Sequence, residues 1–281
     1  MSRTTTSRRA LTINLLVMVC AVGLLQACGD KKKRPAPVIN PNGYYTNTGT
    51  LTVQDNGSIA RTDLQAMIYG TRFIMMSVQG GLVYDGTITQ TDSTFTGTLS
   101  VFTNGINPSS TTVTGTINQG VGITGTLAGT GAGSGTFSLN YTAASNQAAS
   151  VTRINGTAGN PTWTSFIGGS TSNLEFTLGI PGTPISGNNE PQEGNFRLCG
   201  ITGTDVIGGA RGMIPISDTS LYSVRVRVVN CDPGIIPSPL SDNAGEYTGF
   251  AASRSDLTTD DTLVMVITSN NGAFSISGDF K

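Results

Sequence analysis

The chain has 281 residues, with 16 Lys and Arg, 17 Asp and Glu, and no histidine. The lack of histidine excludes Ser-His-Asp and Cys-His nucleophiles as well as His-ligated metal sites. No lysine lies between Arg34 and Lys281, which also excludes an internal Ser-Lys pair. Beyond Arg34 acidic residues outnumber basic ones, which argues against nucleic acid as a partner, because phosphate binding needs a basic surface. We therefore expect no catalytic residue, no metal, no cofactor and no nucleic-acid partner.

Residues 1–27 have the layout of a signal peptide. Arg3, Arg8 and Arg9 precede an uninterrupted apolar run that extends from Leu15 to Leu25. This run is shorter than the about 20 residues that a helix needs to cross a bilayer. We therefore expect residues 1–27 to be removed during export rather than to remain as a transmembrane anchor.

The apolar run leads directly into Leu25-Gln26-Ala27-Cys28. This segment resembles the lipobox of bacterial lipoproteins, where a branched apolar residue and a small residue precede the cysteine. The resemblance implies that Cys28 is lipidated on sulfur and becomes the first residue of the mature protein, anchored in a membrane by several acyl chains. Gly29, instead of aspartate, follows Cys28, which in enterobacterial-type lipoproteins favours the outer membrane. The alternative is an ordinary secretory signal with an incidental cysteine.

Residues 28–42 form a tether between the lipid and the folded body. Lys31–Arg34 is a basic cluster, which either contacts anionic headgroups or is a solvated spacer. Pro35, Pro37 and Pro41 stiffen the segment, which in polyproline geometry reaches about 40 Å at most. We expect the tether to hold the body away from the bilayer.

Two of the four cysteines remain for the folded body, since Cys20 leaves with the signal peptide and Cys28 carries lipid. Cys199 and Cys231 are the two that remain. In an oxidising compartment we expect them to form one disulfide. In the chain-entropy model a loop of this length contributes about 3–4 kcal/mol of stability.

A Thr-Gly-Thr-apolar pattern, with close variants, recurs along the body. When each copy is read with a period of two, glycine falls on the apolar face of a strand, and Thr or Ser falls on the opposite face. One such apolar face holds Phe95, Gly97, Leu99 and Val101; a second holds Val121, Ile123, Gly125 and Leu127; a third holds Gly135, Phe137, Leu139 and Tyr141. The copies are Thr48–Leu51, Asp85–Ile88, Thr96–Leu99, Thr114–Ile117, Thr124–Leu127, Ser134–Phe137 and Ser277–Phe280.

An inward glycine on strand after strand leaves room for bulky neighbours and lets a sheet bend sharply. Turn-forming residues separate the copies at Asp55–Gly57, Gln79–Gly81 and Asn104–Gly105. The sequence therefore predicts an all-β protein, an antiparallel hairpin meander that forms a strongly curled sheet or barrel. A solenoid is the alternative, although the spacing of the copies is too irregular for a strict period.

The alternation lapses over residues 143–155, which we interpret as a linker that is either a loop or one short helix. It divides the body into an N-terminal β meander at residues 43–142 and a C-terminal β domain at residues 156–281, which form one core or two β subdomains. In the second half, Gly179–Gln192 is rich in Gly, Pro and Asn and is predicted to be a long loop. Near the C-terminus, Leu263–Ile267 is predicted to pair with Phe274–Phe280 across Asn270–Gly272.

Residues 43–281 as a whole resemble the Gly- and Thr-rich β-sheet envelope lipoproteins of proteobacteria, many of them uncharacterised. The matching features are the repeated strand motif, the Tyr222 strand that leads to Cys231, the Gly245–Gly249 turn and the Asp261–Leu263 strand. The resemblance implies a protein of the cell envelope, and it brings no known active site.

We expect a membrane-anchored, non-catalytic binding or scaffolding module that presents a rigid β surface to an envelope protein or a surface polymer. The loop Gly179–Gln192 is a candidate contact, because binding residues collect on loops. One alternative is an accessory subunit of an export or surface assembly. Another is a carboxylate-based glycan hydrolase, for which Asp260 and Asp261 are adjacent but point to opposite strand faces. A further alternative is calcium held by loops such as Asp55-Asn56, although turn chemistry alone accounts for these residues.

Replacing Cys28 by serine should abolish lipidation, because the serine hydroxyl cannot take the place of the thiolate nucleophile. The measurement is uptake of labelled palmitate in cells, with Cys20→Ser as the matched control that keeps its label. Labelled Cys28→Ser protein would show that the anchor has been assigned to the wrong residue.

The single disulfide between Cys199 and Cys231 should appear in mass spectra of non-reduced peptides from envelope-purified protein. Cys199→Ala should lower the melting temperature, since the unfolded chain regains the entropy that the cross-link removes. Two free thiols in the purified protein would contradict the pairing.

Overall fold

The regular elements of the computed structural model are β-strands and two short 3-10 turns, with no α-helix in the ranges that it describes. The predicted all-β fold is confirmed. Nowhere in these ranges is there a helix with the length and apolar character needed to cross a bilayer. The ranges are residues 39–54, 57–150, 162–166, 173–177, 213–228, 245–254, 262–273 and 275–280.

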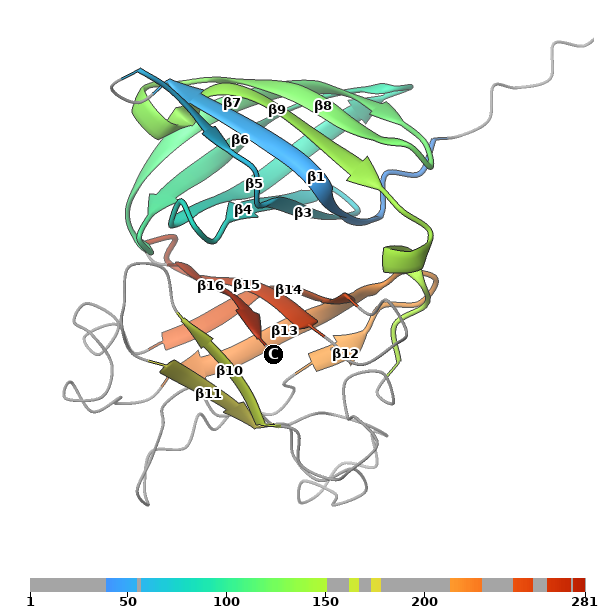
Figure 1. Cartoon of the computed structure of the whole chain (residues 1–281), viewed down its shortest axis with the longest axis vertical. Coiled ribbons are helices and arrows are strands. Elements are labelled where there is room, and N and C mark those ends of the chain that lie inside the picture. The colour runs from blue at the N-terminus through green and yellow to red at the C-terminus, as the bar shows by residue number, and fades with distance from the viewer. Residues whose placement is uncertain are drawn as a thin grey trace, which may run out of the picture. The chain divides into compact units, whose positions relative to one another are not determined.

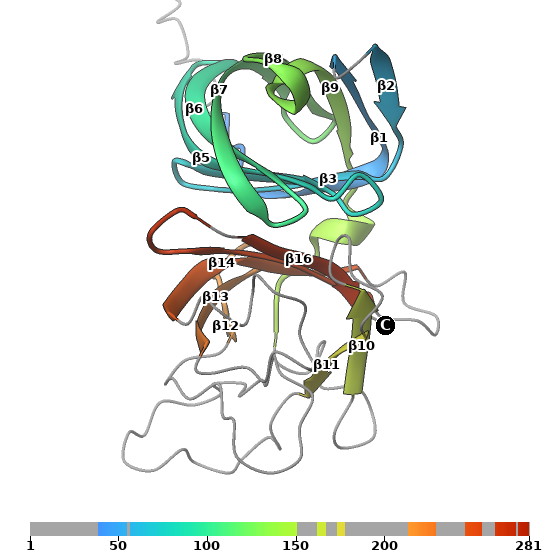
Figure 2. The same ribbon diagram turned by 90° about the vertical axis from the view of Figure 1, so that its left-hand side faces the viewer.

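Nine strands form an antiparallel meander that closes on itself. Consecutive strands pair from β3 to β9, and β1 pairs with both β3 and β9, so that eight strands make a closed ring. Figure 2 looks into this ring. Strand β2 lies outside the ring because it pairs only with the second half of β1. The predicted meander and barrel are confirmed. The strands are β1 (Gly43–Gln54), β2 (Ser58–Arg61), β3 (Leu64–Tyr69), β4 (Arg72–Ser77), β5 (Leu82–Thr91), β6 (Thr94–Thr103), β7 (Ile106–Asn118), β8 (Gly122–Ala128) and β9 (Ser134–Tyr141).

Buried and exposed side chains alternate along the strands, and the buried ones fill the barrel interior. In β6, Phe95 and Leu99 are buried, whereas Thr94, Thr96 and Thr98 are exposed. Strands β7, β8 and β9 repeat this pattern. Buried side chains from all eight barrel strands join in one apolar cluster. Each large side chain that is fully removed from water stabilises the fold by about 1.5–3 kcal/mol, so this cluster is the main source of stability in the barrel.

The motif glycines make room for aromatic rings inside the barrel. In one row across four strands, Phe95 pairs with Gly115, Gly115 with Gly125, and Gly125 with Phe137. A methyl group added at Gly115 would overlap the Phe95 ring, and one at Gly125 would overlap the Phe137 ring. Phe73 of β4 lies 5.8 Å from Phe95 and 6.1 Å from Phe137, measured between ring centroids. The predicted role of inward glycines is confirmed at these two positions.

A second sheet follows the barrel in the chain, in the order β12-β13-β14-β15-β16. The predicted C-terminal hairpin is confirmed: β15 and β16 pair from Leu263 with Phe280 to Thr268 with Ser275. Gly272 in the turn has φ 70°, a conformation that glycine adopts without strain. Separately, β10 and β11 form a two-stranded hairpin, which Figure 1 also labels. These strands are β10 (Thr162–Phe166), β11 (Asn173–Thr177), β12 (Met213–Pro215), β13 (Leu221–Val228), β14 (Gly245–Arg254), β15 (Thr262–Ser269) and β16 (Ser275–Phe280).

Strands β3 and β4 are buried on both faces. Their inward side chains belong to the interior cluster, and their outward ones, among them Met67, Ile74 and Met76, belong to a second cluster. This second cluster also contains Phe250 and Val266 of the C-terminal sheet. The outer surface of β3 and β4 is thus covered, and residues 39–281 form one compact unit.

A polar network ties β4 and β5 to the C-terminal sheet. The Arg72 guanidinium donates from Nε to Oδ1 of Asp85 (3.0 Å) and from Nη2 to Oδ2 (2.7 Å). The same Nη2 donates to the Thr248 carbonyl (3.0 Å), and Thr268 Oγ1 donates to Asp85 Oδ2 (2.5 Å). The guanidinium carbon also lies 5.4 Å from the Phe250 ring centroid. A two-pronged ion pair of this kind adds directional specificity to the apolar contact around it.

Two details differ from the sequence analysis or refine it. Val121 was predicted to face the interior, and this is wrong: it is 57% exposed in the turn before β8, where its amide donates to the Asn118 carbonyl. The predicted linker begins with a single 3-10 turn, Ala144–Asn146. The Asn146 side chain accepts from the Tyr44 amide and donates to the Tyr44 carbonyl, as a neighbouring strand would.

Gly125→Ala should lower the free energy of unfolding by about 1–3 kcal/mol, because the added methyl group overlaps the Phe137 ring in a filled core. Thr126→Ser, one residue away and exposed, is the control and should change it by about 0.5 kcal/mol or less. The measurement is chemical denaturation.

Combining Gly125→Ala with Phe137→Leu should cost less than the sum of the two single changes, since a smaller side chain at 137 relieves part of the overlap. Strict additivity would show that the ring is not the obstacle.

Candidate functional site

The candidate functional residues predicted from the sequence lie outside the part of the chain that the structure describes. This holds for the lipidated Cys28 and for Cys199 and Cys231. It also holds for the loop Gly179–Gln192 and, among the alternatives, for Asp55-Asn56 and Asp260-Asp261. The structure brings none of them into a described site, and the candidate site that it does describe lies on the barrel.

Four acidic residues of the described ranges either have structural partners or occupy turns. Asp63 accepts from Ser77 Oγ (2.6 Å) and from the Gln79 amide (2.7 Å), and Asp85 is held by Arg72. Asp92 and Asp218 occupy left-handed turn positions, with φ 53° and 59°. Within the described ranges no three His, Cys, Asp or Glu residues are grouped so as to hold a metal ion.

Three buried tyrosines, Tyr45, Tyr84 and Tyr247, give no acid-base group near neutral pH. Burial raises the pKa of Tyr247 to about 12. Burial also raises the pKa of Tyr84, and it raises that of Tyr45 together with the nearby Tyr141. These hydroxyls stay protonated; that of Tyr45 donates to the Pro41 carbonyl and that of Tyr84 to the Ala132 carbonyl, both at 2.6 Å. Their chemistry is structural.

The outer surface of β6, β7, β8 and β9 carries threonines in register, and we call it the threonine face. Because the strands pair residue by residue, the outward hydroxyls line up in ladders that cross all four strands. Two ladders flank the row of inward residues that runs from Phe95 to Phe137. The first, the paired ladder, is Thr94, Thr116, Thr124 and Ser138; the second, the open ladder, is Thr96, Thr114, Thr126 and Thr136.

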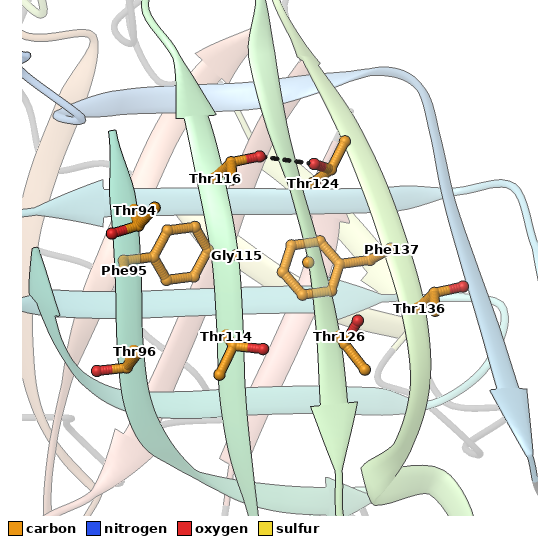
Figure 3. Close-up of a pocket in the computed structure, with 11 residues that line it drawn as sticks. Thr94, Phe95, Thr96, Thr114, Gly115, Thr116, Thr124, Thr126, Thr136 and Phe137 are labelled. Atoms are coloured by element: carbon orange, nitrogen blue, oxygen red, sulfur yellow. Dashed lines mark hydrogen bonds between the residues drawn. The ribbon is translucent and has the colours of Figure 1, made fainter. Parts of the chain in front are cut away.

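A shallow groove of about 550 Å³ lies on the threonine face between the two ladders. Its walls are exposed threonines, and its floor is the row where side chains point inward, with Gly115 and Gly125 at the centre. Figure 3 shows the ladders on either side of Phe95, Gly115 and Phe137. The same row that accommodates the rings inside the barrel therefore leaves a depression outside it.

The two ladders differ in their hydrogen bonds. In the paired ladder, Thr116 and Thr124 share a hydrogen bond of 3.0 Å, drawn in Figure 3, and Thr94 Oγ1 donates to the Thr91 carbonyl (2.9 Å). In the part of the chain that the structure describes, the four hydroxyls of the open ladder make no hydrogen bond to protein. The open ladder therefore presents four free hydroxyls, each a donor and an acceptor, along one wall of the groove.

The threonine face carries no charge. Residues 93–152, which include all of β6, β7, β8 and β9, contain no Asp, Glu, Lys or Arg. A typical soluble domain has about 25–35% charged residues on its surface. This charge-free stretch can be read from the sequence alone, and it is the signal that would have located the face before the structure.

No protein-family model, no curated protein and no solved structure matches the chain.

Proposed function

We propose that this chain is a lipid-anchored protein of the bacterial cell envelope, held at the outer membrane through Cys28, that binds a partner through the threonine face and catalyses no reaction. The signal-peptide layout and the lipobox of residues 1–28 support the anchor. The observation that supports the binding role is the uncharged, hydroxyl-lined groove on β6 to β9.

The barrel supports binding at its surface, because its interior is occupied. The interior cluster draws buried side chains from every strand of the ring. Phe73, Phe95 and Phe137 meet inside it, two of them against inward glycines. A small barrel filled with side chains is a rigid scaffold, and ligands of such scaffolds bind on the outside or at loops.

Among the described residues, one side of the barrel wall is covered and the side formed by β7 and β8 is exposed. Outward side chains of β3, β4 and β5, such as Met67, Ile74 and Val83, lie in the cluster shared with the C-terminal sheet. Outward side chains of β7 and β8, such as Thr114, Thr116 and Thr126, are exposed. An uncharged exposed surface lowers the solubility of a free protein, which favours a surface that meets a partner.

Site-specific photo-crosslinking in intact cells tests the binding role. A crosslinking residue at Thr126, within the groove, should give a discrete adduct with an envelope protein or a surface polymer. The control position is Thr71, an exposed turn residue between β3 and β4, which should give none. If the protein is an accessory subunit of an export assembly, the protein crosslinked at Thr126 should be a component of that assembly. Equal or absent adducts at both positions would argue against the face.

A hydrolase screen tests the absence of catalysis. The purified protein, incubated with peptidoglycan, glycan and ester substrates, should give no more product than a buffer control. Turnover that is lost when one Asp or Glu is neutralised, with the fold intact, would establish a carboxylate enzyme instead.

A further inference from the structure

We propose that the partner of the threonine face is an uncharged polysaccharide whose chain lies along the groove, across β6, β7, β8 and β9. This inference rests on the proposed binding function and gives its ligand class.

The open ladder matches a chain of sugar hydroxyls. Thr96, Thr114, Thr126 and Thr136 stand on adjacent strands, so their hydroxyls recur at the strand separation of about 4.8 Å. Each can donate one hydrogen bond and accept others, which is also the capacity of a sugar hydroxyl. A linear array of equivalent sites suits a polymer with a repeating unit better than a single small solute.

The groove combines hydroxyl and methyl groups as a sugar ring combines hydroxyl and C–H groups. Every wall residue is threonine, which carries both groups on one carbon. The floor at Gly115 and Gly125 is bare backbone, so a ring can approach the sheet without meeting an outward side chain. The volume of about 550 Å³ lies within the range of ligand sites in proteins, about 300–1,000 Å³.

The absence of charged residues narrows the class of ligand further. An anionic polymer or a lipid headgroup gains its affinity from Lys and Arg, and residues 93–152 supply neither. Protein partners bind mainly through buried aromatic, Arg and large apolar anchors. Among the described residues of β6 to β9 and their turns, the exposed large hydrophobic side chain is Val121, at the tip of the β7–β8 turn. An uncharged, hydroxyl-rich polymer is the class that remains.

The test compares two pairs of Thr→Val changes in the full-length lipoprotein. The groove pair is Thr114→Val with Thr126→Val, two directly paired residues of the open ladder. The matched control is Thr87→Val with Thr98→Val, which are also directly paired and exposed but lie outside the groove. Valine keeps the approximate size and the β-branching and replaces the hydroxyl by a methyl group, and melting curves check that each variant is folded.

The probes are immobilised dextran, amylose, mannan and β-glucan, with dextran sulfate as the charged counterpart of dextran. We expect the wild type to bind at least one neutral polymer, with little change between low and high salt. The groove pair should weaken this binding about tenfold or more, which corresponds to about 1.4 kcal/mol. The control pair should bind as the wild type does, and Thr114→Ser with Thr126→Ser should restore most of the affinity.

Three outcomes would overturn the inference: salt-sensitive binding to dextran sulfate alone, an equal loss in the groove and control pairs, or no binding to any neutral polymer. In those cases the crosslinking experiment at Thr126 distinguishes failure of the polysaccharide proposal from failure of the proposed binding role. A specific protein adduct at Thr126 without polysaccharide binding would retain the binding face and replace its ligand. No adduct and no polysaccharide binding would remove both.

Discussion

The packing of two aromatic rings against two glycines is the constraint on which the barrel depends. Phe95 and Phe137 fill the interior only because positions 115 and 125 carry no side chain. Phe73 from the opposite wall then contacts both rings. Because inward and outward residues alternate, the same row leaves the groove floor bare on the outside. The core and the candidate site are thus two faces of one packing arrangement.

The barrel wall is asymmetric, and the asymmetry determines which of its outer surfaces is exposed to water. Strands β3 and β4 bury both faces, one in the barrel and one against the C-terminal sheet, where Arg72 and Asp85 add directional bonds. Strands β7 to β9 bury a single face and keep an uncharged one in water. The sequence reflects this division. The covered strands β3 and β4 contain continuous apolar runs, whereas threonines alternate with apolar residues in the uncovered strands β7 to β9.

Period-two alternation made the meander, the inward glycines and the C-terminal hairpin predictable from the sequence. Alternation could not identify β3 and β4 as strands, because strands that are buried on both faces show no alternation of apolar and polar residues. Closure depends on β1 pairing with β9, a contact between distant residues that no local pattern encodes. The alignment of Thr96, Thr114 and Thr126 depends on the register of three strands, whereas the lack of charge in residues 93–152 is visible in the sequence itself.

Ring closure also has a consequence for aggregation. Uncharged strands rich in threonine and other strong β-formers readily add further strands at an open edge, and most sheets guard such edges with charged residues or proline. Strands β6 to β9 have no charged residue to act as a gatekeeper. The pairing of β9 with β1 takes over that protection, since it leaves the ring without a free edge. Before this last pairing forms, the edges of β9 and β1 are open, and the chain is at its most vulnerable to association with other copies.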